Sequence, residues 1–177
     1  MIKKGIILAG GSGTRLSPLT KSVNKQLLPI NDKPMIFYPL SIMMLSNIKK
    51  ILMVVNPGQI DNFKSLLGNG SRYGIEINYK IQDKPRGLPD AFNLGRHFIG
   101  KDNVALILGD NFFYGQSLTK KLEKSSIHKS GATIFLKEVS RPDNYGVAKI
   151  KKNRIEKILE KPKKYISNKA ITGLYFF

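Results

Sequence analysis

Strand-like apolar runs alternate with helical patterns through the first two thirds of the chain, and this alternation limits the possible folds more than any other feature. The expected strands are residues 4–9, 51–55, 75–81 and 104–108, and the expected helices are 34–47, 59–67, 89–98 and 118–127. Strands that are joined through helices form parallel sheets covered on both faces. The pattern therefore predicts an α/β fold with a doubly wound, mainly parallel sheet.

Four further strand-like runs follow, at 132–139, 147–150, 154–159 and 171–177. The last run ends in three aromatic residues, Tyr175, Phe176 and Phe177, with no polar segment after them. An uncovered aromatic strand favours aggregation. Either it is a central strand that closes the domain, or the chain is the front part of something longer, and we favour the second. Since 177 residues without a linker suit one domain, we expect a single domain over 1–177 that is truncated at its C-terminus.

The chain is strongly basic, with 30 Lys and Arg residues against 12 Asp and Glu residues and a formal net charge of +18. Such a surplus can bind a phosphate backbone by releasing its counterions. No helix-turn-helix, zinc-finger or RNA-binding signature accompanies it. We therefore favour solvent faces decorated with lysine, do not expect nucleic acid as a partner, and keep a polyanion-binding protein as an alternative.

Composition excludes several other classes of protein. Because the chain has no cysteine, it has no disulfide framework, thiolate zinc site or cysteine nucleophile. Its two histidines, His97 and His128, make a histidine-rich metal site a poor hypothesis. No apolar run approaches the roughly 18 residues of a membrane span, and the first run is too short for a signal peptide. We expect a soluble, cytoplasmic protein.

A glycine-rich segment, LAGGSGTRL at 8–16, follows the first expected strand directly. Glycines there let the backbone turn tightly and point N–H groups at phosphate oxygens. The segment is neither a P-loop nor a dinucleotide fingerprint. Arg15 adds a guanidinium that can bind the same phosphates. This favours a phosphate-binding loop over a plain turn.

Two further charged residues extend the phosphate hypothesis. Lys25 stands ten residues after Arg15 and offers a second cation, although an ordinary solvated lysine is the alternative. Asp110 follows the buried run 104–108, and ligands of open α/β sheets bind at the carboxyl ends of the strands. A carboxylate there suits Mg²⁺ on a nucleotide, and a helix-capping aspartate is the alternative.

These residues belong to segments that are spread over the whole chain. The segments are GIILAGGSGTRL (5–16), KQLLPI (25–30), DKPMIFYPLS (32–41), LGDN (108–111), FYG (113–115), YGV (145–147), EKP (160–162) and TGLYF (172–176). Together they resemble the sugar-phosphate nucleotidyltransferases, and among these the thymidylyltransferases that act on glucose 1-phosphate. The KQLLP form distinguishes the chain from uridylyl and cytidylyl relatives. The resemblance implies a Rossmann-like nucleotidyltransferase fold.

The resemblance also implies roles for individual residues. Catalysis would rest on Arg15 and Lys25, with Mg²⁺ as cofactor on Asp110. Gln26 would contact the deoxyribose, and Gln82 and Gly87 the base. The remaining nucleotide-binding residues would be Leu8, Gly10, Gly11, Ser12, Gly13 and Thr14. The sugar-phosphate site would consist of Tyr145, Gly146, Glu160, Lys161 and Ile171.

The implied reaction transfers a thymidylyl group from dTTP to glucose 1-phosphate, giving dTDP-glucose and pyrophosphate. The alternatives are a UTP-using relative and an inactive or split nucleotide-binding fragment that needs a partner chain. The resemblance implies a homo-oligomer, a dimer or a tetramer, and no membrane.

The chain departs from the family pattern at three positions and in length. Arg86 replaces an acid before Gly87, and Pro89-Asp90 replaces a small residue and a glutamine. Family members continue well beyond the last position of this chain, with a second metal-binding aspartate and a further basic residue for the sugar phosphate. We therefore expect residues 1–177 alone to bind dTTP but to transfer it poorly.

Overall fold

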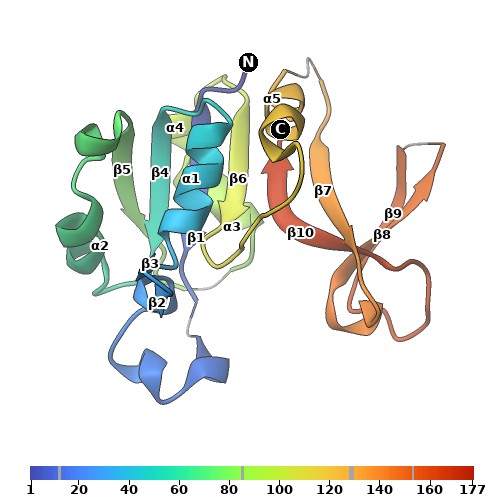
Figure 1. Cartoon of the computed structure of the whole chain (residues 1–177), viewed down its shortest axis with the longest axis horizontal. Helices are drawn as coiled ribbons and strands as arrows, with labels where there is room; N and C mark the ends of the chain where they lie inside the picture. Colours follow the sequence, from blue (N-terminus) through green and yellow to red (C-terminus); the bar gives the residue numbers. More distant parts are fainter. Residues whose placement is uncertain (12, 85, 128–129, 153) are drawn as a thin grey trace.

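The apolar runs of the sequence form one mixed sheet in the computed structural model, which describes all residues except 12, 85, 128–129 and 153 (Figure 1). The strands are β1 (Lys4–Ala9), β4 (Lys50–Val55), β5 (Glu76–Ile81), β6 (Val104–Leu108), β7 (Thr133–Glu138), β8 (Gly146–Lys151), β9 (Arg154–Glu160) and β10 (Lys169–Phe176). Their order is β5-β4-β1-β6-β10-β8-β9, and β7 also pairs with β10. A separate short ribbon consists of β2 (Pro29–Ile30) and β3 (Lys33–Pro34).

Helices connect and cover the first strands, as the alternating pattern predicts. They are α1 (Phe37–Leu45), α2 (Ile60–Leu67), α3 (Pro89–Leu94), α4 (Arg96–Ile99) and α5 (Leu118–Ser125). Short 3₁₀ turns occupy Thr14–Leu16, Leu19–Lys21, Lys25–Leu27, Ser71–Tyr73 and Pro142–Asn144. None of the helices in the described part of the chain combines the length and apolar character that a membrane span needs.

The expected helix over 89–98 is divided into α3 and α4 at Gly95. A Cβ at this position would lie 2.9 Å from the carbonyl oxygen of Ala91 and 3.2 Å from the side chains of Ile6 and Leu52. A side chain at this position would crowd the sheet, so Ile6 and Leu52 would have to shift by a few tenths of an ångström to accept it. Propensity alone does not reveal such a contact.

The strands β5, β4, β1 and β6 are all parallel, which confirms the first part of the fold prediction. The second half of the sheet is antiparallel: β10 runs against β6, β7 and β8, and β8 runs against β9. The description of the sheet as mainly parallel therefore holds only for its first half. Only two residues separate β8 from β9 in the sequence, and so short a connection can join only antiparallel strands.

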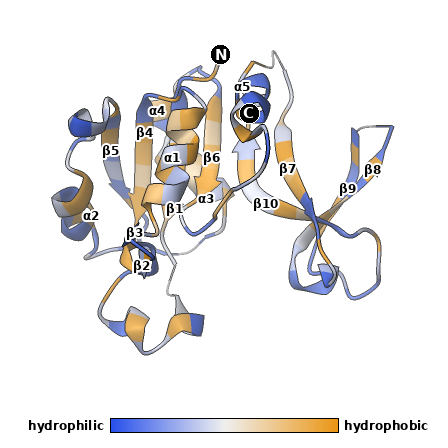
Figure 2. Cartoon of the chain, viewed as in Figure 1, coloured by the Kyte–Doolittle hydropathy of each residue, from blue (hydrophilic) through white to orange (hydrophobic). Residues whose placement is uncertain are grey.

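Two hydrophobic clusters cover the two faces of the parallel strands. One contains Ile7 and Met53 with residues of α1, α2 and α5, and the other contains Ile6 and Leu52 with residues of α3 and α4. Neighbours in a strand point to opposite faces, and β1, β4 and β6 each contribute residues to both clusters. Figure 2 shows mostly hydrophobic residues along β4, β1, β6 and α1.

The aromatic run near residue 177 lies inside the sheet. β10 pairs with β6 on one side and with β7 and β8 on the other, and Leu174 and Phe176 are fully buried. Phe177 exchanges two backbone hydrogen bonds with Val104. β10 is therefore a central strand of the sheet, and the expectation that it lies uncovered is wrong.

Candidate functional site

The candidate site lies along one edge of the sheet because four parallel strands end there. Ala9 is level with Val55, and Val55 with Ile81, so the residues after β1, β4 and β5 are neighbours. Leu8 is level with Leu108, which places the residues after β6 on the other side of β1. The strand pairing thus gathers Gly10, Asn56, Gln82 and Asp110 from distant parts of the sequence.

The glycine-rich loop begins where β1 ends. Gly11 and Gly13 have φ values of 112° and 59°, a region that residues with side chains rarely adopt. The side chain of Asn56 holds the loop: its Nδ2 donates to the carbonyl of Gly11, 3.1 Å away, and its Oδ1 accepts from the N–H of Gly11 at 3.2 Å. The predicted contact Ser12 lies outside the described residues. Thr14 and Arg15 follow in an exposed 3₁₀ turn.

Arg15 has no hydrogen-bond or ion-pair partner among the residues that the structure describes. A guanidinium has five donors in a fixed planar arrangement that suits phosphate. Leu8, by contrast, lies within β1 and packs with the hydrophobic cluster under α3 and α4. Its proposed nucleotide contact stays a prediction.

The segment around Lys25 is fastened to the end of β1 by two amides. Asn24 donates from Nδ2 to the carbonyl of Ala9 at 3.3 Å and accepts from the backbone N–H of Gln26 at 2.9 Å. Gln26 donates from Nε2 to the carbonyl of Gly10 at 3.2 Å. Gln26 is only 2% exposed, and its Oε1 has no hydrogen-bond partner among the described residues. A buried orphan acceptor of this kind costs about 1–3 kcal/mol, and a hydroxyl of a ligand could satisfy it.

Lys25 and Asp110 form an ion pair with 2.6 Å between Nζ and Oδ2, and both side chains are about one third exposed. Asp110 is brought to this point by Gly109, whose N–H donates to the carbonyl of Leu8 at 2.8 Å. A Cβ on Gly109 would lie 2.7 Å from that carbonyl oxygen, so β1 and the end of β6 approach each other only because residue 109 is glycine.

Gln82 follows β5 and lies on the other side of the loop from Asp110. Its Oε1 is directed toward Gly10, because a Cβ built there would lie 3.6 Å from it. Its Nε2 donates to Oδ2 of Asp90 at 2.8 Å. Arg86 lies 3.9 Å from the other oxygen of Asp90, and Gly87 has a φ of 82° in an exposed loop. Two of the departures from the family pattern, Arg86 and Asp90, therefore lie next to the predicted base contact Gln82.

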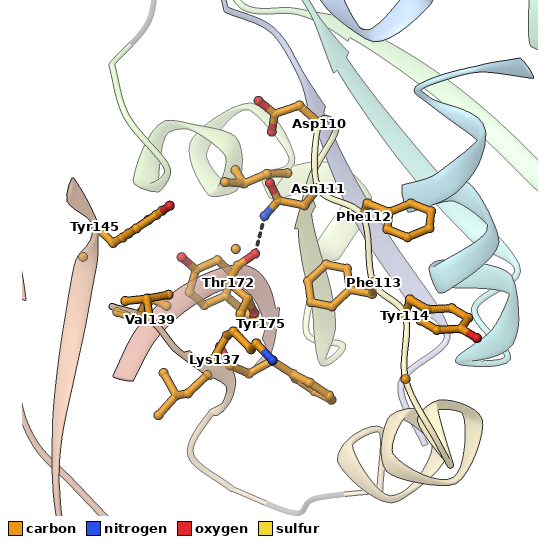
Figure 3. A pocket seen from close by; sticks show the side chains of 18 of the residues that line it. Asp110, Asn111, Phe112, Phe113, Tyr114, Lys137, Val139, Tyr145, Thr172 and Tyr175 are labelled. Atoms are coloured by element: carbon orange, nitrogen blue, oxygen red, sulfur yellow. Dashed lines mark hydrogen bonds between the residues drawn. The ribbon is translucent and has the colours of Figure 1, made fainter. Parts of the chain in front are cut away.

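A cavity of about 940 Å³ adjoins Asp110 and lies between the end of β6 and the antiparallel strands (Figure 3). Figure 3 shows Asp110 and Asn111 at one end, the aromatic side chains of Phe113 and Tyr114 along one wall, and Tyr145 across from them. Of the predicted sugar-phosphate residues, the lining includes Tyr145, Gly146, Glu160 and Ile171. It does not include Lys161, the glycine-rich loop or Lys25, which lie outside this cavity.

The positions of Gly146 and Glu160 follow from the β8–β9 pairing, in which the two residues are opposite each other. The carboxylate of Glu160 lies over Gly146, since a Cβ there would be 2.7 Å from Oε2 of Glu160. Lys161 donates its N–H to the carbonyl of Tyr145 at 3.0 Å, and its exposed side chain lies outside the cavity lining. An acceptor held over open space suits a ligand rich in hydroxyl groups.

The floor of the cavity is tied to β6 through Asn111. Its Nδ2 donates to the carbonyl of Thr172 (Figure 3), next to Gly173, where the pairing of β10 with β7 is irregular. Gly173 has a φ of 74°, and a Cβ there would lie 2.6 Å from Leu108. Burial raises the pKa of the Tyr175 phenol, with a smaller contribution from the negative charge of Glu160. The hydroxyl of Tyr175 therefore stays protonated in the cavity at neutral pH.

Sequence reasoning gave no role to four residues that shape this site. They are Asn24, Asn56, Asn111 and Thr172. Asn56 was detectable, because it directly follows the buried strand β4 in the same way that Asp110 follows β6. The contacts of Asn24 and Thr172 depend on the return of distant chain segments, which leaves no local signal.

The donor set of the site fits a metal that arrives with a phosphate ligand. Within the described ranges, no group of three His, Cys, Asp or Glu residues could hold a metal ion. Asp110 supplies a single carboxylate, with one oxygen engaged by Lys25. Magnesium is commonly held by one or two carboxylates together with substrate phosphates and water. Asp110 is therefore suited to Mg²⁺ that is bound jointly with a nucleotide.

Comparison with known proteins agrees with this geometry. The chain is 53% identical over 175 residues to a glucose-1-phosphate thymidylyltransferase of Neisseria meningitidis, and 50% identical over 176 residues to one of Xanthomonas campestris. These alignments cover 98% and 99% of this chain but only 61% and 60% of the relatives. The chain thus spans about three fifths of the length of these curated relatives.

Solved structures show the same fold. A crystal structure described as a putative glucose-1-phosphate thymidylyltransferase of Bacillus anthracis has a TM-score of 0.91 and 38% identity, and the match covers 98% of this chain and 70% of that one. A UDP-glucose pyrophosphorylase complexed with UDP-glucose has a TM-score of 0.84 and 26% identity, over 99% and 76% of the two chains. The family model described as nucleotidyl transferase matches residues 4–177. The chain therefore belongs to the nucleotidyl transferase family.

Proposed function

We propose that this protein transfers a thymidylyl group from dTTP to glucose 1-phosphate, giving dTDP-glucose and pyrophosphate. The observation that carries the proposal is the Lys25–Asp110 ion pair, which stands between the glycine-rich loop and the cavity that Asp110 helps to line. A phosphate bound by the loop and a second phosphate in the cavity would meet at this pair. The relatives from Neisseria meningitidis and Xanthomonas campestris, at 53% and 50% identity, carry the name of this activity.

The reaction needs positioned positive charge more than a general base. An oxygen of glucose 1-phosphate forms a bond to the α-phosphorus of dTTP, while the bond from that phosphorus to the bridging oxygen of pyrophosphate breaks. A phosphate monoester is largely a dianion at neutral pH, because its second pKa is about 6. The nucleophile therefore needs no residue to remove a proton, which suits a site without histidine in its described contacts. Repulsion between anions and misalignment are the main obstacles.

The residues at the edge where the parallel strands end can supply this positive charge and alignment. Arg15, without a protein partner among the described residues, and Lys25 would bind and neutralise the phosphates, and the loop held by Asn56 would offer its backbone N–H groups. Asp110 would hold Mg²⁺, which supplies further charge neutralisation when it is bound. Gln26 offers its unpaired Oε1 to a sugar hydroxyl, and Gln82 stands where the base would lie.

The cavity would hold the second substrate. The carboxylate of Glu160 over Gly146 can accept hydrogen bonds from glucose hydroxyls, and the phenols of Tyr145 and Tyr175 can donate. The volume of about 940 Å³ exceeds what a sugar phosphate fills, and so leaves room for the nucleotide α-phosphate near Asp110.

A pyrophosphate-release assay with dTTP, glucose 1-phosphate and Mg²⁺ tests the proposal, together with calorimetry of dTTP binding. We expect release only when both substrates and the metal are present. A protein that neither binds dTTP nor releases pyrophosphate contradicts the proposal. Binding without release would support the second candidate, a nucleotide-binding part of a longer or split enzyme, which the 60% coverage of the relatives favours.

The same assay with UTP tests the related activity of a uridylyltransferase. The 26% identical UDP-glucose pyrophosphorylase makes this comparison necessary. dTTP and UTP differ by the methyl group of thymine and the 2′-hydroxyl of ribose, and a hydrophobic pocket discriminates a methyl group by only about 1–3 kcal/mol. We therefore expect UTP to serve as a slower substrate, and a clear preference for UTP would replace the thymidylyl assignment.

A further inference from the structure

The pair of Gln82 and Asp90 is a buried polar contact next to the glycine-rich loop. Gln82 is 9% exposed and follows β5, and Asp90 is 8% exposed and lies in the first turn of α3. The Nε2 atom of Gln82 donates to Oδ2 of Asp90 over 2.8 Å. Two polar side chains from different elements are thus held against each other with little access to water.

The chemistry of the two groups determines how the amide is turned. An ionised carboxylate only accepts hydrogen bonds, whereas an amide has a donor end and an acceptor end. The opposite orientation would place the carbonyl oxygen of Gln82 against the carboxylate oxygen of Asp90, with no proton between them. Gln82 must therefore present its NH₂ group to Asp90, and its Oε1 points away, toward Gly10.

Arg86 also faces Asp90, but it does not compete with Gln82 for the same carboxylate oxygen. Its Nη1 is 3.9 Å from Oδ1 of Asp90, the oxygen that Gln82 does not use. Its side chain is 64% exposed, so solvent screens the charge and the pair contributes little to stability. A glutamine at position 90, as in the family pattern, offers both a donor and an acceptor and would allow either orientation of Gln82.

We propose that Asp90 is a positioning residue that fixes the amide of Gln82 with its carbonyl oxygen toward the nucleotide base, and so selects thymine or uracil against cytosine. The ring N3 of thymine and uracil carries a proton and can donate to Oε1 of Gln82. The N3 of cytosine carries a lone pair and would face that oxygen without a proton. The inference rests on the proposed function, since it assumes that a nucleotide base binds beside Gly10.

Calorimetry of the whole chain with dTTP and with dCTP tests the inference. We expect the wild type to bind dTTP at least about tenfold more tightly than dCTP, because a mismatched base leaves polar groups unpaired. In Asp90→Asn the residue at position 90 can donate as well as accept, so Gln82 can turn, and the preference for dTTP falls about tenfold. Asp90→Glu, which keeps an acceptor, retains most of the preference, and so does Arg86→Gln.

A second measurement does not depend on nucleotide binding. In ligand-free protein labelled with ¹⁵N, the side-chain NH₂ of Gln82, assigned by its loss in Gln82→Glu, should exchange slowly with water. We expect exchange to become at least about tenfold faster in Asp90→Asn, while the thermal midpoints of Asp90→Asn and Asp90→Glu report whether both variants are folded.

The outcomes separate the two proposals. If dTTP binds and Asp90→Asn keeps the full preference over dCTP, the inference is wrong and the proposed function stands. If none of the nucleotides binds to the wild type, the proposed function is wrong and the inference falls with it. An Asp90→Asn variant that is folded and loses the preference, with rescue in Asp90→Glu, supports the positioning role over a purely structural one.

Discussion

The ammonium group of Lys25 lies 2.6 Å from the carboxylate of Asp110, although 85 positions separate the two residues in the chain. Each was expected to bind a different part of the reacting complex, the phosphate for Lys25 and the metal for Asp110. In the free protein each neutralises the other at the junction of the loop and the cavity. Binding of nucleotide and metal would replace this ion pair by a contact between Lys25 and phosphate and a contact between Asp110 and the metal.

Asp110→Asn should weaken the metal dependence of turnover. A neutral amide is a poor ligand for Mg²⁺, so we expect the Mg²⁺ concentration for half-maximal turnover to rise at least about tenfold. Affinity for dTTP without metal should stay the same or increase, because Lys25 becomes free. The control is Asp102→Asn, which removes the partner of Lys4 at the opposite edge of the sheet. An unchanged Mg²⁺ titration in Asp110→Asn would leave Asp110 with a structural role only.

Arg15→Ala should reduce turnover about 10²- to 10³-fold, the usual effect of removing one preorganised charge contact from a transition state. The side chain is exposed and has no partner among the described residues, so the thermal midpoint should hardly change. Arg96→Ala, an exposed arginine on α4, serves as the control and should keep full turnover. Equal rates in the two variants would remove Arg15 from the mechanism.

Gly109→Ala should destabilise the fold by about 1–3 kcal/mol, because the new methyl group would lie 2.7 Å from the carbonyl oxygen of Leu8. The new methyl group would push the end of β6 away from β1 and so displace Asp110. Turnover should therefore decrease as well. Gly115→Ala is the matched control: apart from its two chain neighbours, no described residue lies within 4 Å of the added methyl group, and stability should change by less than about 0.5 kcal/mol. Urea denaturation of both variants checks the difference.

Gly146→Ala should raise the KM for glucose 1-phosphate with little effect on stability. The added methyl group would be 2.7 Å from Oε2 of Glu160, and the end of a glutamate side chain can move away. Glu160 then no longer lies over the cavity in the same position. Steady-state kinetics should show a higher KM for the sugar phosphate and an unchanged KM for dTTP, and equal changes in both would contradict the assignment of the cavity.

Tyr79→Phe should change how stability depends on alkaline pH. Burial raises the pKa of Tyr79 from 10.0 to about 12, and its hydroxyl donates to the carbonyl of Gly68 over 2.6 Å. Above pH 10 the unfolded tyrosine loses its proton while the native one keeps it, so the native state binds more protons and stability falls as pH rises toward 12. Two pKa units correspond to about 2–3 kcal/mol, and because Tyr79 is only partly buried, solvent screening keeps the loss of stability below this figure.

The comparison for Tyr79 is made between proteins, since lysines titrate in the same range. Tyr79→Phe should be less stable than the wild type at pH 8 by about 1 kcal/mol for the lost hydrogen bond. The difference between the two proteins should shrink or reverse by pH 12. Parallel stability curves from pH 9 to pH 12 would show that the hydroxyl of Tyr79 is not buried as described.

The amino-acid sequence by itself predicted the eight strands of the main sheet and the approximate positions of the helices, but neither the short strands β2 and β3 nor the division at Gly95. The phosphate-binding role of the loop stays a prediction. Local conformational preferences are enough to predict β1 and the loop after it. An apolar run such as Lys4–Ala9 forms a strand, and glycine readily adopts the positive φ values of Gly11 and Gly13. The position of Asp110 after a buried strand also followed from chain order, because parallel strands end at one edge.

Only the tertiary structure decided which side chains meet. The contacts of Asn56 with Gly11, Lys25 with Asp110 and Gln82 with Asp90 depend on the register of separate strands and on the path of the loops between them. The interior position of β10 depends likewise on strands that precede it by tens of residues. Local sequence does not specify strand register. If one strand shifts by one residue against its neighbour, the β-propensity of each residue stays the same but the residue opposite each one changes.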